Sequence, residues 1–385
     1  MRRLLRPAIA VALVAFGLRV DPVIGIAVLL GVWGFASWVL PARAVAGVTG
    51  TRQLPSSALF GEEVEVRLQV SSERRLPWLA ITDSHPFDLG ESRRWVTALG
   101  PGETRTDVVR LHATARGLHR IGPAVAVTGD GFGGRKVQKT LVSASTILIY
   151  PRIVPIEDLA VAAAAPLPLI PTRTPLYEDP TRIIGVRQYE TGDPMRRIHW
   201  SASAASGDLQ VKKFRPAIAR DVVVLVDLGR DSHPTPGRRR SAELAVTTAA
   251  SIVHHLAVEQ RESVGLRLLY RDTPTGQSSV AAISPGRDQS RVGRMLESLA
   301  RSDLTPIDGL DALVDPATLP FGASVVLVTG RADRRHLLHA LRLRRLGMPV
   351  TVILTASDLH YDDAGLERLG VPVRRVARLA EMIDL

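Results

Sequence analysis

Residues 185–204 concentrate side chains that can recognise another molecule. Three arginines, one histidine, one tyrosine and one tryptophan lie around the turn signature Gly192-Asp193-Pro194. This density of planar hydrogen-bonding groups is unusual for a surface loop, and a guanidinium group can bind a partner's carboxylate with two parallel hydrogen bonds. We therefore interpret the stretch as a candidate protein-interaction motif. Its candidate residues are Arg187, Tyr189, Gly192, Asp193, Arg196, Trp200 and Ser203.

The same residues could instead form a structural corner. In that interpretation Trp200 is buried, Asp193 accepts hydrogen bonds from the backbone or from an arginine, and the other cations are solvated. Loop residues carry function more often than their number suggests, which keeps the interaction hypothesis open. We expect a division of roles, in which Trp200 packs in a core while Arg187 and Arg196 face a partner.

A second candidate site follows a predicted strand. Residues 222–226 are all apolar, which is typical of a strand buried on both faces of a parallel sheet, and Asp227 comes directly after them. A later predicted strand, residues 324–329, ends in Thr329. Because ligands of open α/β sheets collect at the carboxyl ends of the strands, Asp227 and Thr329 lie at the edge where a ligand would bind.

The sequence contains no complete catalytic motif. It has no cysteine, which excludes thiolate nucleophiles, disulfides and cysteine metal sites. His336 and His339 lack the glutamate and the i, i+4 spacing of a zinc-binding helix. Gly129, Gly131 and Gly134 match a dinucleotide-binding pattern, but we expect a strand after them where such a site needs a helix. We predict neither an enzyme nor a cofactor.

The N-terminal segment predicts a membrane anchor. Residues 23–40 carry no charge, and this length reaches the lower limit for spanning a hydrocarbon core of ~30 Å. A weaker apolar run at residues 7–18 precedes it, so we expect a hairpin of two transmembrane helices. A cleaved signal peptide is disfavoured, since no small-residue cleavage site follows the first run. Arginines flank both ends, with Arg43 and Arg52 on the C-terminal side, which predicts a multi-pass protein of the cell membrane with cytoplasmic soluble domains.

The rest of the chain changes character twice. Between residues 50 and 150, short segments of alternating polarity separated by turn residues predict an all-β sandwich. Five prolines between residues 160 and 180 indicate a stiff linker. From residue 221 onward, strands alternate with helices, as in a doubly wound, Rossmann-like α/β domain. The predicted domains are 1–45 (transmembrane hairpin), 46–155 (β-sandwich), 156–182 (Pro/Ala-rich linker) and 183–385 (interaction motif plus α/β domain).

The overall charge narrows the class of partner. Lysine and arginine total 49 against 38 acidic residues, so the formal net charge is +11. Such a surface favours anionic neighbours, which are lipid headgroups, nucleic acid or an acidic protein. With a membrane anchor predicted, a lipid bilayer is the expected neighbour, and nucleic-acid binding is a less favoured alternative.

The pattern R-x-Y-x-x-G-D-x-x-R-x-I-x-W-x-x-S-A, which runs from Arg187 to Ala204, resembles the signature of the domain of unknown function 58 family. The Tyr150-Pro151 pair at the end of the predicted sandwich is similar to that family as well. The resemblance implies a transmembrane pair, a β-sandwich and a von Willebrand factor A-like domain. Because family members are commonly encoded beside MoxR-type AAA+ ATPases, it also implies a protein partner. We expect a membrane-anchored, cytoplasm-facing adaptor that works with such an ATPase.

The resemblance raises the question of a metal site. Von Willebrand A domains bind Mg²⁺ through D-x-S-x-S after their first strand, where carboxylate and hydroxyl oxygens are the ligands. This chain has Asp227-Leu228-Gly229-Arg230-Asp231 at that place. With both hydroxyls replaced, we expect no metal, and Asp227 and Asp231 are the candidates if one binds. The alternatives left open are a metal-dependent hydrolase at this strand edge and a basic nucleic-acid-binding protein.

Overall fold

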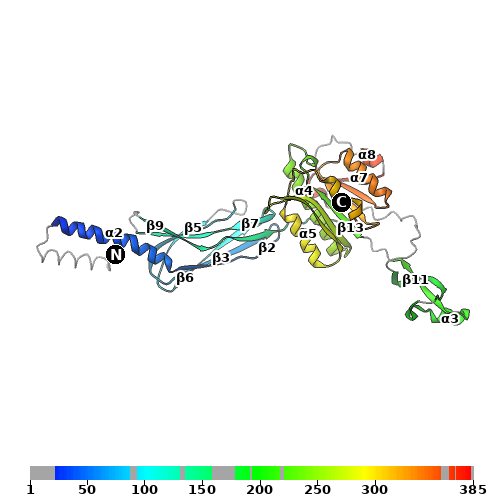
Figure 1. Cartoon of the computed structure of the whole chain (residues 1–385), viewed down its shortest axis with the longest axis horizontal. Coiled ribbons are helices and arrows are strands. Elements are labelled where there is room, and N and C mark those ends of the chain that lie inside the picture. The colour runs from blue at the N-terminus through cyan, green and yellow to red at the C-terminus, as the bar shows by residue number, and fades with distance from the viewer. Residues whose placement is uncertain are drawn as a thin grey trace. The chain divides into compact units, whose positions relative to one another are not determined.

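The computed structural model describes residues 22–86, 93–130, 135–157, 178–190, 193–216, 221–356, 364–368 and 370–382. Two compact units divide the chain, Met1–Arg152 and Ile153–Leu385 (Figure 1). Three sequence predictions fall outside the described residues: the first apolar run at 7–18, most of the linker, and Gly192. The two units are treated separately below.

The first unit begins with the long apolar helix α2 (Pro22–Ala46). Its side chains are largely exposed, and Ile24–Ala46 is the one helix among the described residues that is long and apolar enough to cross a membrane. Arg43 lies in its last turn, where a cation interacts favourably with the helix dipole. The second of the two predicted transmembrane segments, residues 23–40, therefore lies within one exposed apolar helix.

Three sheets follow α2 in a β-rich region. Their strands are β1 (Val48–Gln53), β3 (Glu63–Ser72) and β6 (Glu103–His112) in the first sheet, β5 (Arg93–Leu99), β4 (Leu76–Asp83), β8 (Ala124–Gly129) and β9 (Lys136–Val142) in the second, and β2 (Ser57–Ala58), β10 (Ser145–Ile149) and β7 (Gly117–Ile121) in the third. Strand β3 alternates as predicted, with Val64, Val66, Leu68 and Val70 buried. The first two pack against β7 and β10, and the last two against β4 and β8. The sheets thus enclose two apolar cores.

Arg52 lies inside this region, although the sequence suggested a flank of the membrane helix. Its guanidinium donates two hydrogen bonds to the Asp83 carboxylate, at 3.1 and 2.5 Å, and further bonds to the carbonyls of Ile121 and Ser143, both at 3.1 Å. Its side chain is 1% exposed. Gly122 has φ +92°, and a Cβ there would lie 2.4 Å from the guanidinium. Arg52, which the sequence counts among the basic residues after the apolar helix, is therefore a buried side chain that connects strands of the β-rich region.

The glycine-rich pattern at residues 129–134 lies between two strands, and its residues 131–134 lie outside the described residues. Strand β8 ends at Gly129, and the next described element is strand β9. A Cβ at Gly129 would lie 2.5 Å from the carbonyl oxygen of Arg135, so glycine allows the two strands to approach each other. The expectation that a strand, and not a helix, follows Gly129 agrees with β9.

The second unit includes a small hairpin that carries the candidate interaction motif. Strand β11 (Glu178–Gln188) pairs antiparallel with β12 (Gln210–Pro216). Between them lie a single turn of 3₁₀-helix, η1 (Met195–Arg197), and the short helix α3 (Trp200–Ser206). Figure 1 labels β11 and α3 in this hairpin.

The rest of the second unit is an α/β sheet of seven strands. Strands β14 (Ser263–Asp272), β13 (Asp221–Asp227), β17 (Ser324–Thr329), β18 (Val350–Leu354) and β19 (Val373–Arg375) are parallel neighbours in that order, and β15 (Ser278–Gly286) and β16 (Ser302–Asp303) pair antiparallel with β14. The helices are α4 (Arg238–His254), α5 (Gln289–Arg301), α6 (Leu310–Leu313), α7 (Arg334–Arg345) and α8 (Ala364–Arg368), with short turns η2 (Arg230–Ser232), η3 (His255–Glu259), η4 (Pro316–Thr318) and η5 (Leu379–Met382). The antiparallel strand β15 was not predicted.

Successive residues of β13 point to opposite faces of the sheet. Val222, Val224 and Val226 pack in one core with α4 and α5, whereas Val223 and Leu225 pack in another with α6 and α7. Both faces are therefore covered, as the uniformly apolar sequence of this strand predicts. The charged residue that ends the strand is thus held at the rim of two cores.

Candidate functional site

The strand order identifies one edge of the α/β sheet as the place for a site. From β13 the chain passes to β14 on one side, and it later returns to place β17 on the other side. Such a reversal opens a crevice outside the carboxyl ends of the strands, which is where open α/β sheets bind ligands. Asp227 ends β13 and Thr329 ends β17, so both lie at this point, as expected.

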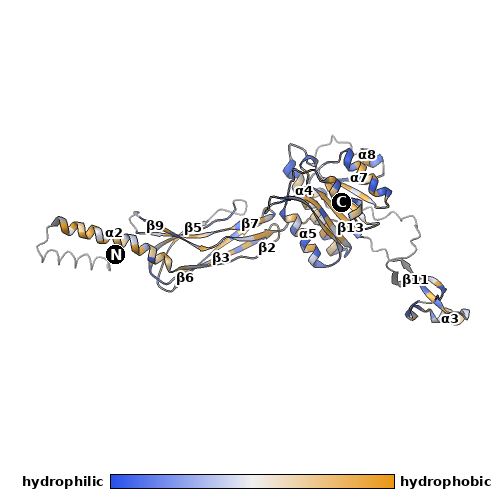
Figure 2. Cartoon of the chain, in the orientation of Figure 1, coloured by the Kyte–Doolittle hydropathy of each residue, from blue (hydrophilic) through white to orange (hydrophobic). Residues whose placement is uncertain are grey.

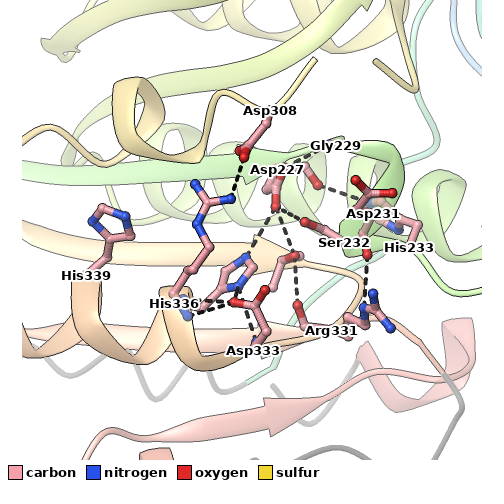
Figure 3. Close-up of polar contacts among 12 residues, drawn as sticks. Asp227, Gly229, Asp231, Ser232, His233, Asp308, Arg331, Asp333, His336 and His339 are labelled. Carbon is pink, nitrogen blue, oxygen red and sulfur yellow. Dashed lines mark hydrogen bonds and ion pairs between the residues drawn. The ribbon is translucent and has the colours of Figure 1, made fainter. Parts of the chain in front are cut away.

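The Asp227 carboxylate is buried and accepts hydrogen bonds from several donors (Figure 3). The Gly229 amide donates at 2.8 Å, and the Ser232 hydroxyl donates a short bond. Thr329 Oγ1 lies at 3.4 Å, and Nε2 of His336 at 3.3 Å. The Asp227 side chain is 1% exposed, so this carboxylate is satisfied by the protein itself.

His336 supplies a positive charge to this carboxylate. It lies in the first turn of α7, its side chain is 3% exposed, and its Nδ1 is 2.7 Å from Oδ1 of Asp333, the N-cap of that helix. Burial alone lowers the pKa of an imidazole, but the hydrogen bonds to Asp227 and Asp333 outweigh it and raise the pKa of His336 to about 9. His336 is therefore an imidazolium at neutral pH, held between two carboxylates.

The two carboxylates are perturbed in the opposite direction. Burial would raise the pKa of Asp227, but the hydrogen bonds from His336 and Ser232 hold it below its ordinary value. The hydrogen bond from His336 also lowers the pKa of Asp333. The cluster is an internal anion, cation, anion series.

A second buried histidine supports the loop after β13. Nε2 of His233 lies 2.9 Å from the Asp227 carbonyl oxygen, and Nδ1 lies 2.8 Å from the Ser241 hydroxyl. Burial lowers the pKa of His233, so a neutral ring donates at Nε2 and accepts at Nδ1. Gly330 fits against it because a Cβ there would lie 2.3 Å from the Ser232 carbonyl oxygen. The loops after β13 and β17 are thus packed against each other.

The cluster does not fit a divalent metal site. The oxygens of Asp227 already accept hydrogen bonds, and one donor is the His336 imidazolium. Asp231 is exposed in η2, where its carbonyl oxygen accepts a bond from Nε of Arg331. Among the residues that the structure describes, no three His, Cys, Asp or Glu side chains are grouped to hold a metal ion. Sequence reasoning considered His336 only as a zinc ligand and missed its pairing with Asp227, for which the one local signal is Asp333 at the start of the helix.

An ion pair between Arg187 and Asp193 holds the turn of the interaction motif. Arg187 donates two hydrogen bonds to the Asp193 carboxylate, at 2.7 and 2.6 Å, and the Glu190 amide donates to the same carboxylate at 3.0 Å. These bonds, first of all that from Arg187, lower the pKa of Asp193. Arg187, which we expected to face a partner, pairs with Asp193 through both guanidinium nitrogens and is 44% exposed. Arg196 is exposed.

Ile198, His199 and Ser203 fix helix α3 against the hairpin. Ile198 is 2% exposed and forms a β-bridge with Val211. His199 caps α3 by accepting a bond from the Ala202 amide, and Ser203 Oγ accepts a bond from the Gln210 amide at 2.8 Å. The candidate residue Ser203 is therefore a structural lock.

Trp200 is 64% exposed, so the prediction that it packs in a core is wrong. Ile198 occupies the buried position instead. Met195 is similarly exposed, at 63%. The Tyr189 amide bonds the Leu209 carbonyl oxygen at 2.9 Å, which continues the strand pairing to the base of the turn. The motif presents Met195, Arg196 and Trp200 outward from an ordered backbone.

Residues 185–353 match the model of the family described as Protein of unknown function DUF58. This match supports the resemblance of the signature and covers both the hairpin and the sheet as far as β18. No curated protein matches the chain.

Several solved structures align with about a quarter of the chain. The CARDB domain of a Pyrococcus furiosus protein has 15% identity and a TM-score of 0.21, over 26% of this chain and 91% of that one. The sulfur carrier protein SoxY of Chlorobium limicola has 14% identity and a TM-score of 0.19, over 26% and 78%. A β-glucosidase of Listeria innocua has 14% identity and a TM-score of 0.18, over 26% and 16%. These scores are too low to define a shared fold.

The DUF58-matching α/β unit should lose stability as pH rises. Because the pKa of His336 is raised to about 9 in the folded protein, its stabilising charge is fully present below the unfolded pKa of about 6.5 and is lost as pH rises through 9. We expect the free energy of opening of β13 to fall by about 3 kcal/mol over that range. Hydrogen exchange of the β13 amides in the full chain, corrected for the intrinsic exchange rate, measures it.

The carboxylates act at the other end of the pH scale. Since the pKa values of Asp227 and Asp333 are lowered, their contribution to the stability of the folded unit is present above the ordinary carboxyl pKa and is lost as pH falls below it.

The His336→Gln variant is the control for the loss of stability at high pH, because glutamine does not titrate. If the free energy of opening of β13 changes equally with pH in the wild type and in this variant between pH 6.5 and 9, the stabilising charge does not come from His336.

Proposed function

We propose that the protein is a membrane-anchored adaptor of the DUF58 family whose hairpin docks onto a protein partner. Helix α2 supplies the anchor. The arginines around it, Arg43 among them, favour a cytoplasmic position for the two units by the positive-inside rule. The partner proposed from the family resemblance is a MoxR-type AAA+ ATPase.

The observation that carries the proposal is the exposure of Trp200. The Trp200 side chain is 64% exposed, so most of its surface is available for contact with a partner. Tryptophan is enriched among the residues that dominate binding energy. Arg196 lies four residues before it, and arginine has the same enrichment. The surrounding contacts, Arg187 with Asp193 and Ser203 with Gln210, hold the backbone that presents both side chains.

We further propose that the α/β unit is a von Willebrand A-like domain whose cation is built into the chain. Its Asp227 follows the first strand, where such domains hold Mg²⁺, and the His336 imidazolium takes the charge-balancing role. This favours a binding role over the hydrolase alternative, because a metal would have to displace donors that already satisfy Asp227. No contact among the described residues favours nucleic-acid binding.

The Trp200→Ala variant should weaken capture of a purified MoxR-type ATPase about 30-fold, as expected for a binding hot spot of roughly 2 kcal/mol. The full chain, in detergent or nanodiscs, is immobilised on a surface, and the dissociation constant is obtained from the binding of the ATPase to it. Arg196→Ala should weaken binding as well, and neither change should alter the melting curve.

Phe321→Ala is the matched control, since this phenylalanine is 82% exposed in the turn before β17 and not on the hairpin. It should bind the ATPase like the wild type. A dissociation constant unchanged by Trp200→Ala would contradict docking through the hairpin.

A further inference from the structure

A groove of about 480 Å³ runs along helix α2 where the helix meets the β-rich region. Its volume lies within the range of about 300–1,000 Å³ that binds small ligands. Leu29, Val32, Trp33 and Leu40 form one wall, and the turn between β3 and β4 together with the end of β8 forms the other. Figure 2 shows that most residues of helix α2 are hydrophobic.

The apolar wall belongs to the helix that can cross a membrane. Val32 and Trp33 are about half exposed, and both line the groove. In a bilayer such side chains lie among acyl chains, so hydrocarbon is the medium on this side. The groove therefore opens where lipid is the neighbouring molecule.

The other end of the groove is cationic. Arg43, in the last turn of α2, and Arg74 and Arg75, in the β3–β4 turn, all line it, whereas Asp130 is the acidic lining residue. Nη1 of Arg74 donates to the carbonyl oxygen of Arg43 at 2.9 Å, which fixes the turn against the helix end. Three cations against one carboxylate make this end complementary to an anion.

Two further basic side chains bind the C-terminal half of α2 and the residues just after it. Arg135 donates to the Trp38 carbonyl oxygen at 2.8 Å, and its guanidinium lies 4.9 Å from the centre of the Trp38 ring. Lys139 donates to the carbonyl oxygens of Ala46 and Val48 at 2.8 and 2.7 Å. Tryptophan and basic residues together are typical of the membrane interface.

We propose that this groove binds one anionic phospholipid, with an acyl chain along Val32 and Trp33 and the headgroup phosphate against Arg43 and Arg75. The acyl chain selects a lipid over free phosphate, and the arginines select an anionic lipid over a zwitterionic one. The inference rests on α2 lying in a membrane, as in the proposed function, and it is independent of docking through the hairpin.

Native mass spectrometry of the detergent-solubilised full chain tests the groove. With added phosphatidylglycerol, the wild type should retain one lipid, and with phosphatidylcholine it should retain about tenfold less. The Arg43→Gln/Arg75→Gln variant should bind phosphatidylglycerol about tenfold more weakly, because each cation near an anionic headgroup contributes. Arg342→Gln/Arg345→Gln, which makes the same charge change on exposed residues of α7, is the matched control and should bind normally.

A second pair of variants tests the apolar wall without any change of charge. Ala36→Phe fills the groove and should abolish lipid retention, whereas Ala27→Phe, on the same helix and outside the groove, should not. Equal retention of both lipids, normal binding by the arginine variant, or displacement of the lipid by millimolar inorganic phosphate would overturn the proposal. Alkaline extraction of membranes reports separately whether α2 anchors the chain.

Discussion

The Arg52→Ala variant is expected to lower the free energy of unfolding of the β-rich unit by about 3–5 kcal/mol, the usual cost of removing one partner from a buried ion pair. Asp83 would then keep a buried carboxylate without its guanidinium, and two main-chain carbonyls would lose their donor. Hydrogen exchange of β3 and β4 amides in the solubilised full chain reports this loss without requiring that the two units unfold together.

A matched control lies in the same region. Arg67 pairs with Glu65 on the exposed side of β3, with both side chains nearly half exposed. Because surface ion pairs contribute about 0–1 kcal/mol, Arg67→Ala should have a small effect. If Arg52→Ala and Arg67→Ala cost the same, the buried tie is not a principal support of the β-rich unit.

The Asp227→Ala variant should destabilise the α/β unit by a similar amount, about 3–5 kcal/mol. It leaves the His336 imidazolium without its buried counter-ion and the Gly229 amide without its acceptor. Asp231→Ala removes the same type of side chain four residues later at an exposed position, so it should cost less than about 0.5 kcal/mol. Exchange of the β13 and β17 amides measures both.

The double variant Asp227→Leu/His336→Leu shows whether the two side chains stabilise the fold through a direct ion pair or through independent packing. If the two residues stabilise each other, the double change should cost at least about 1 kcal/mol less than the sum of the two single changes. Additive effects would show that no pair exists. They would also remove the reason for treating His336 as the built-in cation of this site.

The strands predicted best were those with a regular pattern of burial. The alternation of Val64 to Val70 and the apolar run before Asp227 both reflect which faces of a strand are buried. This pattern appears in the consecutive residues of the strand itself. The antiparallel strand β15 escaped because its serine, alanine and proline composition shows no clear period. Two-residue strands such as β2 have no period at all.

The features that the sequence did not predict have a common physical cause. A cation near a membrane helix looks the same in sequence whether it is solvated or buried, and Arg52 is buried because of Asp83, 31 residues later. Likewise His336 gains its charge from Asp227, 109 residues earlier. Trp200 was expected inside because of its size, but the serines and alanines after it build no apolar face against which it could pack.

The clamped turn of the hairpin has a consequence for binding affinity. Ordering a flexible loop on association costs about 1–2 kcal/mol per residue in backbone conformational entropy. The Arg187–Asp193 pair and the Ser203–Gln210 bond hold this backbone in the folded protein, so the entropy is lost during folding and not on binding. The exposed side chains of Met195, Arg196 and Trp200 remain to be immobilised, at about 0.5–1.5 kcal/mol each. A surface of few residues can therefore bind tightly, and loosening the clamp should weaken binding even where no contact with the partner is lost.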